Sequence, residues 1–428
     1  MVEVFGYFSV QPDWQVDVKS ALAGNEGAHK FWVSAYKQGQ PSIHDTVTVT
    51  RSASADGTSL ISLDTGGAGD ITAEYINPYQ LRLSSQKLGI PPTVYTASRK
   101  SVRCSQITRG SGVQSFDISR YGGLAVACGD DGAMDVYETE GSVHRVQLEG
   151  HFGDVTCCQF FPSGQVALSG ATDMRLKIWS ASDGTNPVTL VGHHAAITDT
   201  SIVGVGKNVV SASKDGTVRL WHCGSSSLLH TFSVSKLPIN RIELVTCSPT
   251  SDAGANAELP PNEFETSGVV VATGCEDGRV VLLDLLSKST VAVFGSLQHA
   301  PVRAVAYDVS QGLIFTGLSD GVVELWSVDD PSTPLYALKR NDSPVTNINL
   351  VRRESGSPLV CVATEDGQLF LASFTLAAGR VTLAEIVEDL VGFDVDPISR
   401  VRVSPSIEKK YGRQAIWASG RGSSVFEF

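Results

Sequence analysis

The chain has 428 residues, of which 42% are hydrophobic and 18% charged, with a formal net charge of −12. A single hydrophobic core stops growing beyond roughly 250–300 residues, so two domains or a repeat architecture is expected. The excess of acidic residues disfavours nucleic acid and anionic membranes as partners and suits a basic protein surface.

The N-terminal residues and the cysteines indicate the cellular compartment of the protein. The first residues, MVEVFGYFSVQPDW, lack the basic region and apolar stretch of a secretory signal. No run approaches the ~18 consecutive apolar residues of a membrane-spanning helix. The eight cysteines form no CxxC pair and no zinc-type spacing with histidine, so we expect buried, reduced thiols. These features predict a cytoplasmic and nuclear protein without a metal or cofactor.

Residues 1–98 contain short runs that favour β-strands, separated by Gly and Ser turns. Pro91 and Pro92 indicate a linker at roughly 89–100. We therefore predict a small β-rich N-terminal domain over 1–98. The expected strands lie at 30–36, 46–50, 59–63, 71–76 and 80–83.

From residue 99 to 428 the sequence repeats a short apolar run, a tight acidic turn and a second apolar run. The repeat is clearest in SASKDGTVRLW, because an Asp-Gly pair between apolar runs is the strongest short-range hairpin signal. Most turns lie 42 to 46 residues apart, the length of one four-stranded propeller blade. A seventh, degraded turn follows at 420–421, so the pattern predicts an all-β, seven-bladed propeller. The six turn aspartates are Asp131, Asp173, Asp215, Asp277, Asp320 and Asp366.

Three repeats carry a His, a Ser or Thr, an Asp and a Trp at regular spacing. The gap from His to Asp is 22, 22 and 21 residues, and the gap from Asp to Trp is six in all three. This pattern resembles the WD-repeat family, which implies a hydrogen-bond tetrad in which His bonds the turn Asp and a hydroxyl links His to the Trp indole. A catalytic triad is disfavoured, because the trio recurs three times and each copy has a structural role. The predicted tetrads are His151, Ser169, Asp173 and Trp179; His193, Ser211, Asp215 and Trp221; and His299, Thr316, Asp320 and Trp326.

Two segments depart from the regular repeat. The last unit supplies three strands, and an unpaired edge there would leave the ring open. We therefore expect residues 102–109 to pair with 423–428 and close the seven-bladed WD-repeat β-propeller. The fourth unit is longer because of residues 247–268, whose Ser, Ala, Pro, Asn and Glu content predicts a solvated loop.

The stretch from Asp154 to Phe232 is more specific than a generic repeat. It contains FFPSG, LKIWS and GKNVVSASKDGTVRLW, and these blocks resemble the proteasomal ATPase-associated factor family. The resemblance extends thinly through the rest of the propeller and faintly to FWVSAY near the N-terminus. It implies a non-catalytic chaperone that binds the C-terminal domain of a proteasomal AAA+ ATPase subunit while the base of the regulatory particle assembles.

The binding face of a propeller usually carries the loops that connect strand d to strand a and strand b to strand c. We call this the top face, and we expect it to present one aromatic ring and an acidic cluster that suit a basic partner. The sequence predicts no catalytic, cofactor-binding or metal-ligating residue. The predicted partner-binding residues are Phe152, Asp154, His194, Asp342, Asp394 and Asp396.

Other functions stay open on the sequence. A generic WD-repeat scaffold or the substrate receptor of a ubiquitin ligase would share this fold. A propeller hydrolase would need paired carboxylates in the central channel, whereas the innermost strands read VTCCQF and VRAVAY and are mainly apolar or small. We expect a binding protein that is monomeric when free of its partner.

Overall fold

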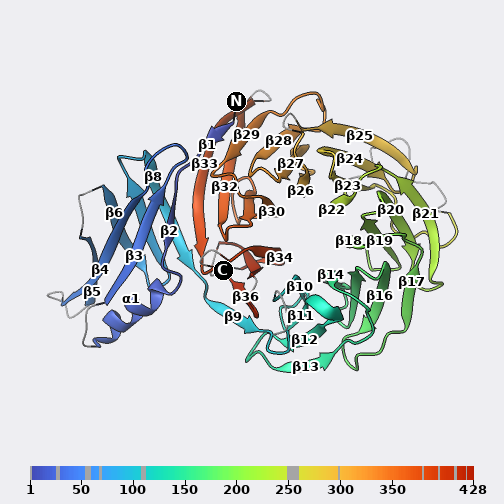
Figure 1. Ribbon diagram of the computed structural model, residues 1–428, viewed down its shortest axis with the longest axis horizontal. Helices are drawn as coiled ribbons and strands as arrows, with labels where there is room; N and C mark the ends of the chain where they lie inside the picture. The colour runs from blue at the N-terminus through green and yellow to red at the C-terminus, as the bar shows by residue number, and fades with distance from the viewer. Residues whose placement is uncertain are drawn as a thin grey trace.

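The computed structural model is a ring of seven blades with a smaller domain attached at its side (Figure 1). Strands dominate the described part of the chain, and no helix in it has both the length and the hydropathy needed to cross a membrane. The prediction of an all-β propeller with a β-rich N-terminal domain is therefore confirmed. The described residues are 2–25, 29–53, 59–66, 70–107, 112–247, 260–296, 299–377, 380–393, 396–408, 412–420 and 422–428.

Each blade is a four-stranded antiparallel sheet, and the first strands of neighbouring blades contact one another around the channel. Blades one to three are β10 (Ser115–Ile118), β11 (Leu124–Cys128), β12 (Met134–Glu138) and β13 (His144–Gln147); β14 (Val155–Phe160), β15 (Val166–Ala171), β16 (Arg175–Ser180) and β17 (Val188–Val191); and β18 (Ile197–Val203), β19 (Asn208–Ser213), β20 (Thr217–His222) and β21 (Ser227–Ser233). A short 3₁₀ turn, η1 (Asp130–Gly132), joins β11 to β12.

Blades four to six follow the same plan. They are β22 (Ile239–Thr246), β23 (Val269–Cys275), β24 (Arg279–Asp284) and β25 (Ser289–Gly295); β26 (Val302–Asp308), β27 (Leu313–Leu318), β28 (Val323–Ser327) and β29 (Tyr336–Lys339); and β30 (Val345–Val351), β31 (Leu359–Thr364), β32 (Leu369–Ala377) and β33 (Arg380–Val391). Blade seven contains β34 (Ile398–Glu408), β35 (Arg413–Gly420) and β36 (Ser424–Glu427).

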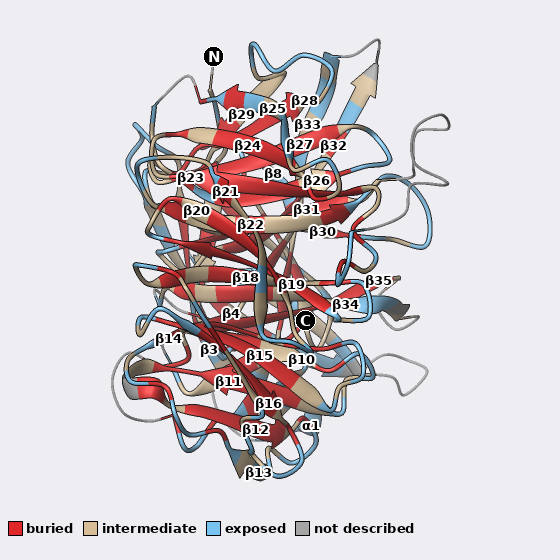
Figure 2. Ribbon diagram, turned by 90° about the vertical axis from the view of Figure 1, so that its right-hand side faces the viewer, coloured by how far each residue is buried: buried red, intermediate tan, exposed pale blue. Residues whose placement is uncertain are grey.

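The conformation of the acidic turns depends on their glycine residues and on the carboxylates of their aspartates. In blade three, Gly216 has φ of 77°, a conformation that glycine adopts without a steric penalty. A Cβ at this position would collide with the carbonyl oxygen of Ser235. The Asp215 carboxylate accepts a hydrogen bond from the backbone N–H of Thr217 at 3.0 Å and so holds the turn. Buried strand residues then pack from blade to blade, while the connecting loops stay exposed (Figure 2).

Blade seven takes its fourth strand from the other end of the ring. Strand β9 (Lys100–Arg103) pairs antiparallel with β36, with Val102 opposite Val425. The closing strand therefore lies at 100–103 and not at 102–109. The Cys104 N–H still donates to the Ser423 carbonyl at 2.7 Å, but a turn from Cys104 to Ile107 then leads the chain away. Residues 108 and 109 lie outside the described part of the chain.

The N-terminal domain consists of two sheets and one helix around a shared core. The five expected strands fall within β3 to β7, which confirms the β-rich prediction for this region. Helix α1 (Trp14–Ala23) was not expected, and it buries Trp14, Val18 and Ala21. Its strands are β2 (Tyr7–Val10), β3 (His29–Tyr36), β4 (Ile43–Ala53) and β5 (Ser59–Thr65) in one sheet, and β6 (Ile71–Asn77), β7 (Gln80–Ser85) and β8 (Ile90–Ala97) in the other.

The predicted linker at 89–100 is wrong, because most of it forms β8. Proline lacks an N–H and is tolerated in a strand where one edge is unpaired or bulged. Pro91 and Pro92 meet this condition: the pairing of β8 with β7 is irregular there, and its pairing with β33 begins only at Val94.

The N-terminal domain is joined to the ring by backbone pairing. Strand β8 continues the sheet of blade six, since it runs parallel to β33 with Val94 opposite Glu388. Strand β1 (Glu3–Val4) runs parallel to the outer strand of blade five, with Glu3 opposite Leu338 (Figure 1). The first 103 residues thus cover the outer edges of blades five and six and complete blade seven.

The long loop of the fourth unit is only partly as predicted. Residues 260–268 dock on blade three: the Asn208 amide donates to the carbonyl oxygen of Asn262 at 2.9 Å, and its own oxygen accepts the Phe264 N–H at 2.6 Å. The Glu265 carboxylate accepts the Val205 N–H at 2.7 Å. The prediction of a solvated loop is therefore wrong for 260–268, and residues 248–259 lie outside the described part of the chain.

Candidate functional site

Blades two and three each contain a continuous hydrogen-bond chain from the acidic turn to the tryptophan of their third strand. In blade two, His151 Nδ1 lies 2.9 Å from Asp173 Oδ2, and its Nε2 lies 2.7 Å from Ser169 Oγ. The Trp179 indole donates to the same hydroxyl at 2.8 Å. In blade three the corresponding distances are 2.8, 2.7 and 2.9 Å, among His193, Asp215, Ser211 and Trp221.

The two tetrads fix the loops that lead onto the top face. Burial lowers the pKa of His151 and of His193, so both rings are neutral at pH 7. Burial alone would raise the pKa of Asp173, but hydrogen bonds from His151 and from the Phe152 N–H lower it overall. The Asp215 carboxylate accepts the N–H of His194 in the same way. Each tetrad thereby holds one predicted partner-binding residue in place.

The predicted tetrad of blade five is wrong. The His299 ring is exposed and makes no hydrogen bond within the described part of the chain, and the buried Trp326 indole N–H has no partner there. The buried Glu324 takes the place of the histidine: its carboxylate accepts hydrogen bonds from Ser296 at 3.1 Å and Thr316 at 3.5 Å. A carboxylate is a stronger acceptor than an imidazole, so the hydroxyl group turns towards Glu324.

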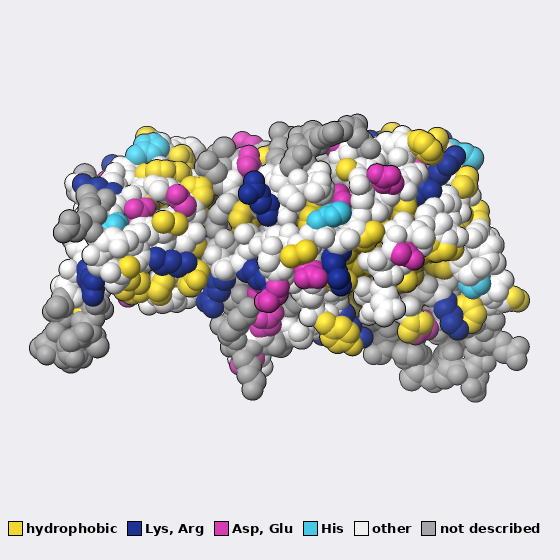
Figure 3. Space-filling model, turned by 90° about the horizontal axis from the view of Figure 1, so that it is seen from below, with side chains coloured by type: hydrophobic (Ala, Val, Ile, Leu, Met, Phe, Trp, Pro, Cys, Tyr) yellow, Lys and Arg dark blue, Asp and Glu magenta, His cyan; other side chains and the backbone are white. Residues whose placement is uncertain are grey.

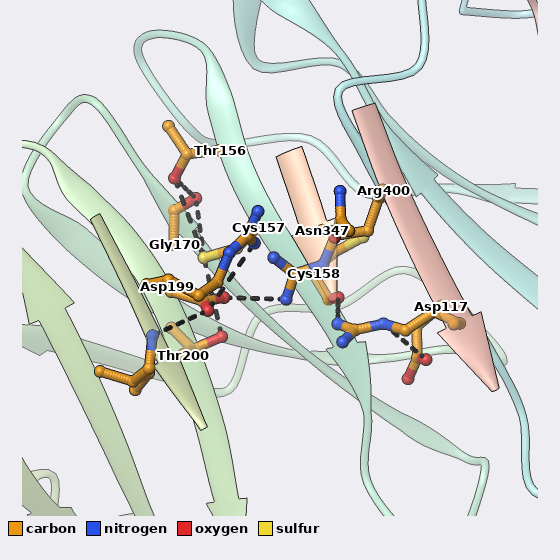
Figure 4. A network of polar contacts seen from close by, with 12 residues as sticks. Asp117, Thr156, Cys157, Cys158, Gly170, Asp199, Thr200, Asn347 and Arg400 are labelled. Atoms are coloured by element: carbon orange, nitrogen blue, oxygen red, sulfur yellow. Dashed lines mark hydrogen bonds and ion pairs between the residues drawn. The ribbon is translucent and has the colours of Figure 1, made fainter. Parts of the chain in front are cut away.

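Charged side chains bridge the central channel. Arg400 of blade seven donates to Asp199 of blade three at 2.9 Å, and Arg241 of blade four lies 3.8 Å from the same carboxylate. Figure 4 shows Asp199 and Arg400 pointing towards each other. A second pair joins Arg402 to Asp117 at 3.2 Å. The Arg400–Asp199 pair spans the channel from blade seven to blade three, whereas Arg241–Asp199 and Arg402–Asp117 join neighbouring blades.

The prediction of a mainly apolar or small channel lining is therefore wrong. The channel holds a cavity of about 950 Å³ that is lined by Asp117, Arg241, Glu243, Asn349 and other strand residues. Burial raises the pKa of Glu243 to about 7. Because Asp117 is paired with an arginine, it is not one of two free carboxylates of the kind that glycoside hydrolysis uses. The channel network joins the blades together.

The predicted partner-binding residues fall into two groups on the top face. Phe152 has 82% of its surface exposed, and Asp154 and His194 are also exposed beside it on the loops that enter blades two and three. Asp342 and Asp396 are exposed on the loops that enter blades six and seven. The structure thus does not gather them into one cluster. Asp394 lies outside the described residues.

Asp342 is fixed by both domains. Its carboxylate accepts hydrogen bonds from the Gln38 amide of the N-terminal domain at 3.0 and 3.1 Å. The Lys339 ammonium lies 2.5 Å from the same carboxylate, and this contact lowers the pKa of Asp342. The N-terminal domain therefore reaches the top face at blade six.

Several exposed side chains on the top face over blades two to four were not predicted. They follow or flank the acidic turns and the loops that enter each blade, where a short sequence motif does not distinguish exposed from covered positions. They add apolar and basic side chains to the top face over blades two to four, where Asp154 is also exposed. The unpredicted residues are Met174, Arg175, Lys214, Lys236 and Leu237.

The side of the molecule that Figure 3 presents is different. Among the side chains drawn in colour there, acidic, basic and hydrophobic groups are interspersed, without one extended patch of a single kind. The top face, with its exposed aromatic ring and its apolar and charged side chains, is the stronger candidate for a protein interface.

Comparisons with known proteins agree with this architecture. The WD domain, G-beta repeat family matches residues 142–180, 184–222 and 291–327. The chain is 32% identical over 412 residues to a protein named Probable proteasomal ATPase-associated factor 1 from Dictyostelium discoideum, which covers 93% of this chain and 91% of the relative. It is 33% identical over 404 residues to human Proteasomal ATPase-associated factor 1, covering 92% of each. The 26S proteasome regulatory subunit RPN14 of Saccharomyces cerevisiae is 32% identical over 224 residues, covering 51% of this chain and 54% of that protein. On the near-full-length matches, the chain belongs to the proteasomal ATPase-associated factor 1 family.

Proposed function

We propose that this protein is a non-catalytic assembly chaperone that binds the C-terminal domain of a proteasomal AAA+ ATPase subunit during assembly of the regulatory particle base. The observation that carries the proposal is the similarity over more than nine-tenths of the chain to relatives named for association with a proteasomal ATPase. The top face supplies the binding surface, and the free protein is a monomer.

The chemistry of the top face supports a protein partner. Phe152 offers a large exposed ring, of the type enriched at the centre of interfaces. Asp396 provides negative charge at the other side of the ring, which favours a partner with lysine or arginine on its surface, whereas the charge of Asp342 is balanced by Lys339. The net charge of −12 disfavours nucleic acid and anionic membranes as alternatives.

The cysteines support a location in the cytoplasm and nucleus. All eight are free, and six of them are buried. Burial raises the pKa of Cys157 and of Cys361 to about 12, so these thiols stay protonated and unreactive. Free, buried thiols are typical of proteins in reducing compartments.

Reversal of one charge tests the proposed face. Asp396→Lys should weaken binding to the purified C-terminal domain of a proteasomal ATPase subunit by roughly fivefold at low salt, because it replaces attraction by repulsion. Isothermal titration calorimetry measures the affinity, and the melting temperature should stay nearly unchanged because Asp396 is exposed.

The matched control is Asp329→Lys, which introduces the same charge on an exposed loop at the opposite face of blade five. This variant should bind as the unmodified protein does. Equal loss in both variants would point to net charge and not to the top face. Unchanged binding by Asp396→Lys would place the interface elsewhere.

A further inference from the structure

A small pocket lies where the N-terminal domain meets blade six. Its volume is about 160 Å³, the size of one large side chain. One wall comes from β2 and the end of β3, and the other from the acidic turn of blade six and the loop after β33. That turn and that loop belong to the top face, so this wall of the pocket lies at the top face. We name it the junction pocket; it is lined by residues 7–10, Tyr36, Tyr95, 366–369 and 389–393.

Aromatic rings form much of the junction pocket. Tyr7 and Tyr36 are stacked, with ring centroids 5.4 Å apart and an interplanar angle of 26°. Tyr95 meets Phe8 edge to face at 5.8 Å, and Phe393 also lines the pocket. Tyr7 and Tyr36 stay partly exposed, whereas the other three rings are buried. The Arg340 guanidinium lies 5.8 Å from the Tyr7 ring centroid, and the partly exposed Tyr7 and Tyr36 give the pocket an electron-rich lining.

The two walls are held rigidly. The Phe8 N–H donates to the Tyr95 hydroxyl at 3.0 Å, and β8, which carries Tyr95, pairs directly with β33. Beneath the rings, Arg340 and Asp389 form a buried ion pair, with Nη2 and Oδ2 3.0 Å apart. Such a site is already formed before a ligand arrives, so a ligand loses less free energy in ordering it.

The charge of the rim selects the ligand. Asp389 is neutralised by Arg340, and the other charged residue among those that line the pocket in the described part of the chain is Asp366, which the exposed Glu365 precedes. The Asp366 carboxylate is held in place by the Asn341 and Gln368 amides, at 2.6 and 2.7 Å. A fixed carboxylate next to aromatic faces favours a cation on an aliphatic stem.

We propose that the junction pocket receives a lysine or arginine side chain of the protein partner, so that the N-terminal domain is part of the partner-binding face. The inference rests on the proposed function for the identity of the partner, but the chemistry of the pocket stands apart from it. The pairing of β8 with β33 holds the N-terminal domain against the ring, which keeps both walls of the proposed binding pocket in place. It also adds an acidic, aromatic site close to Asp342.

The test combines a variant whose side chain fills the junction pocket with binding measurements on small amino-acid probes. Ser9 lines the pocket on β2 beside Tyr7 and is partly exposed, so Ser9→Phe should occupy the space at little cost in stability. The matched control is Ser52→Phe, at an exposed position on β4 of the same domain. The full-length protein labelled with 3-fluorotyrosine reports on Tyr7 and Tyr36 by ¹⁹F NMR.

The probes are N-acetyl-arginine methylamide, N-acetyl-lysine methylamide (free ε-amine) and N-acetyl-norleucine methylamide. The two cationic probes should shift the Tyr7 and Tyr36 resonances with weak, saturable binding, and Ser9→Phe should abolish the shifts while Ser52→Phe retains them. Norleucine, which has the stem without the charge, should bind at least about fivefold more weakly. Equal shifts from norleucine, or none from the cationic probes, would overturn the proposal.

The partner is tested separately. Ser9→Phe should weaken binding of the ATPase C-terminal domain by roughly tenfold, and Ser52→Phe should leave it unchanged. If the ATPase domain fails to bind the unmodified protein while the cationic probes bind, the proposed function is wrong and the pocket assignment stands. If the ATPase domain binds Ser9→Phe as tightly as the unmodified protein, the pocket has no part in the interface and the inference is wrong.

Discussion

Blades three and five carry the same types of residue at nearly the same spacing, but they use them differently. In blade three, His193 connects the turn carboxylate to Ser211, and Trp221 donates to that serine at 2.9 Å. In blade five, His299 is exposed and Trp326 has a buried indole N–H without a partner in the described structure. Equal spacing therefore does not guarantee an equal network.

The residue two positions before the tryptophan accounts for the difference. In blade three it is Arg219, whose guanidinium lies beside Thr217 at 3.4 Å and leaves the serine hydroxyl to the histidine. In blade five it is Glu324, whose carboxylate accepts from both Thr316 and Ser296. A buried acid requires donors and takes the hydroxyl that the histidine would otherwise use.

The largest expected difference between the blades lies at the histidines. His193→Asn should lower the free energy of unfolding by about 2–3 kcal/mol, because the shorter side chain cannot bridge Asp215 and Ser211 and leaves buried polar groups unpaired. His299→Asn should change it by less than ~0.5 kcal/mol, since the ring is exposed and asparagine tolerates its φ of 54°. Urea unfolding followed by far-ultraviolet circular dichroism measures both. Equal losses would show that blade five depends on its histidine after all.

A smaller difference is expected at the tryptophans. Trp221→Phe removes the donor of a buried hydrogen bond, whereas Trp326→Phe removes an N–H that has no partner in the described structure. Both rings are 1% exposed, so the loss of packing should be similar. Trp221→Phe should therefore be the more destabilising by about 1 kcal/mol. The same urea titrations measure the difference, and a larger loss for Trp326→Phe would contradict the assignment of Glu324 as the competing acceptor.

Much of the fold could be predicted because its signals are local. An Asp-Gly turn between apolar runs is decided within a few residues, as at Asp215 and Gly216, and its recurrence gives the number of blades. The pairing of β8 with β33 could not be predicted in this way. It joins Val94 to Glu388, and nothing in the sequence near either residue encodes the other.

The candidate site was less predictable for the same reason. Phe152 and Asp396 could be assigned to the top face because their distance from a turn fixes which end of a strand they follow. The junction pocket combines Tyr7, Tyr36 and Asp366, which come from two domains and meet only in the folded chain. Glu324 gives a second reason why spacing alone was insufficient. Its buried carboxylate accepts the Thr316 hydroxyl that the spacing assigned to a histidine.

The smallest expected effect concerns pH, and it distinguishes a neutral buried histidine from an exposed one. Burial lowers the pKa of His193 in the folded protein, so below the ordinary value of about 6.5 the unfolded chain binds more protons than the folded one. The stability that neutral, buried His193 contributes is therefore complete above a pH of about 6.5 and is lost as the pH falls through the lowered pKa of the folded protein. The contribution of His193 to the free energy of unfolding should therefore decrease between about pH 7.5 and about pH 5.5, with His151 contributing in the same direction. Glu243, whose pKa burial raises to about 7, contributes in the opposite direction, so the histidine effect is measured as a difference between variants.

Replacement of one histidine tests this sign. His193→Gln should start from a lower stability and, relative to the unmodified protein, lose less of it as the pH falls over the same range, because one of the histidines whose pKa is lowered in the folded protein is absent. His299→Gln, which alters a ring outside any tetrad, should keep the slope of the unmodified protein. A His193→Gln slope as steep as that of the unmodified protein would mean that the blade-three tetrad does not hold its histidine neutral, and the contrast with blade five would then rest on hydrogen bonding alone.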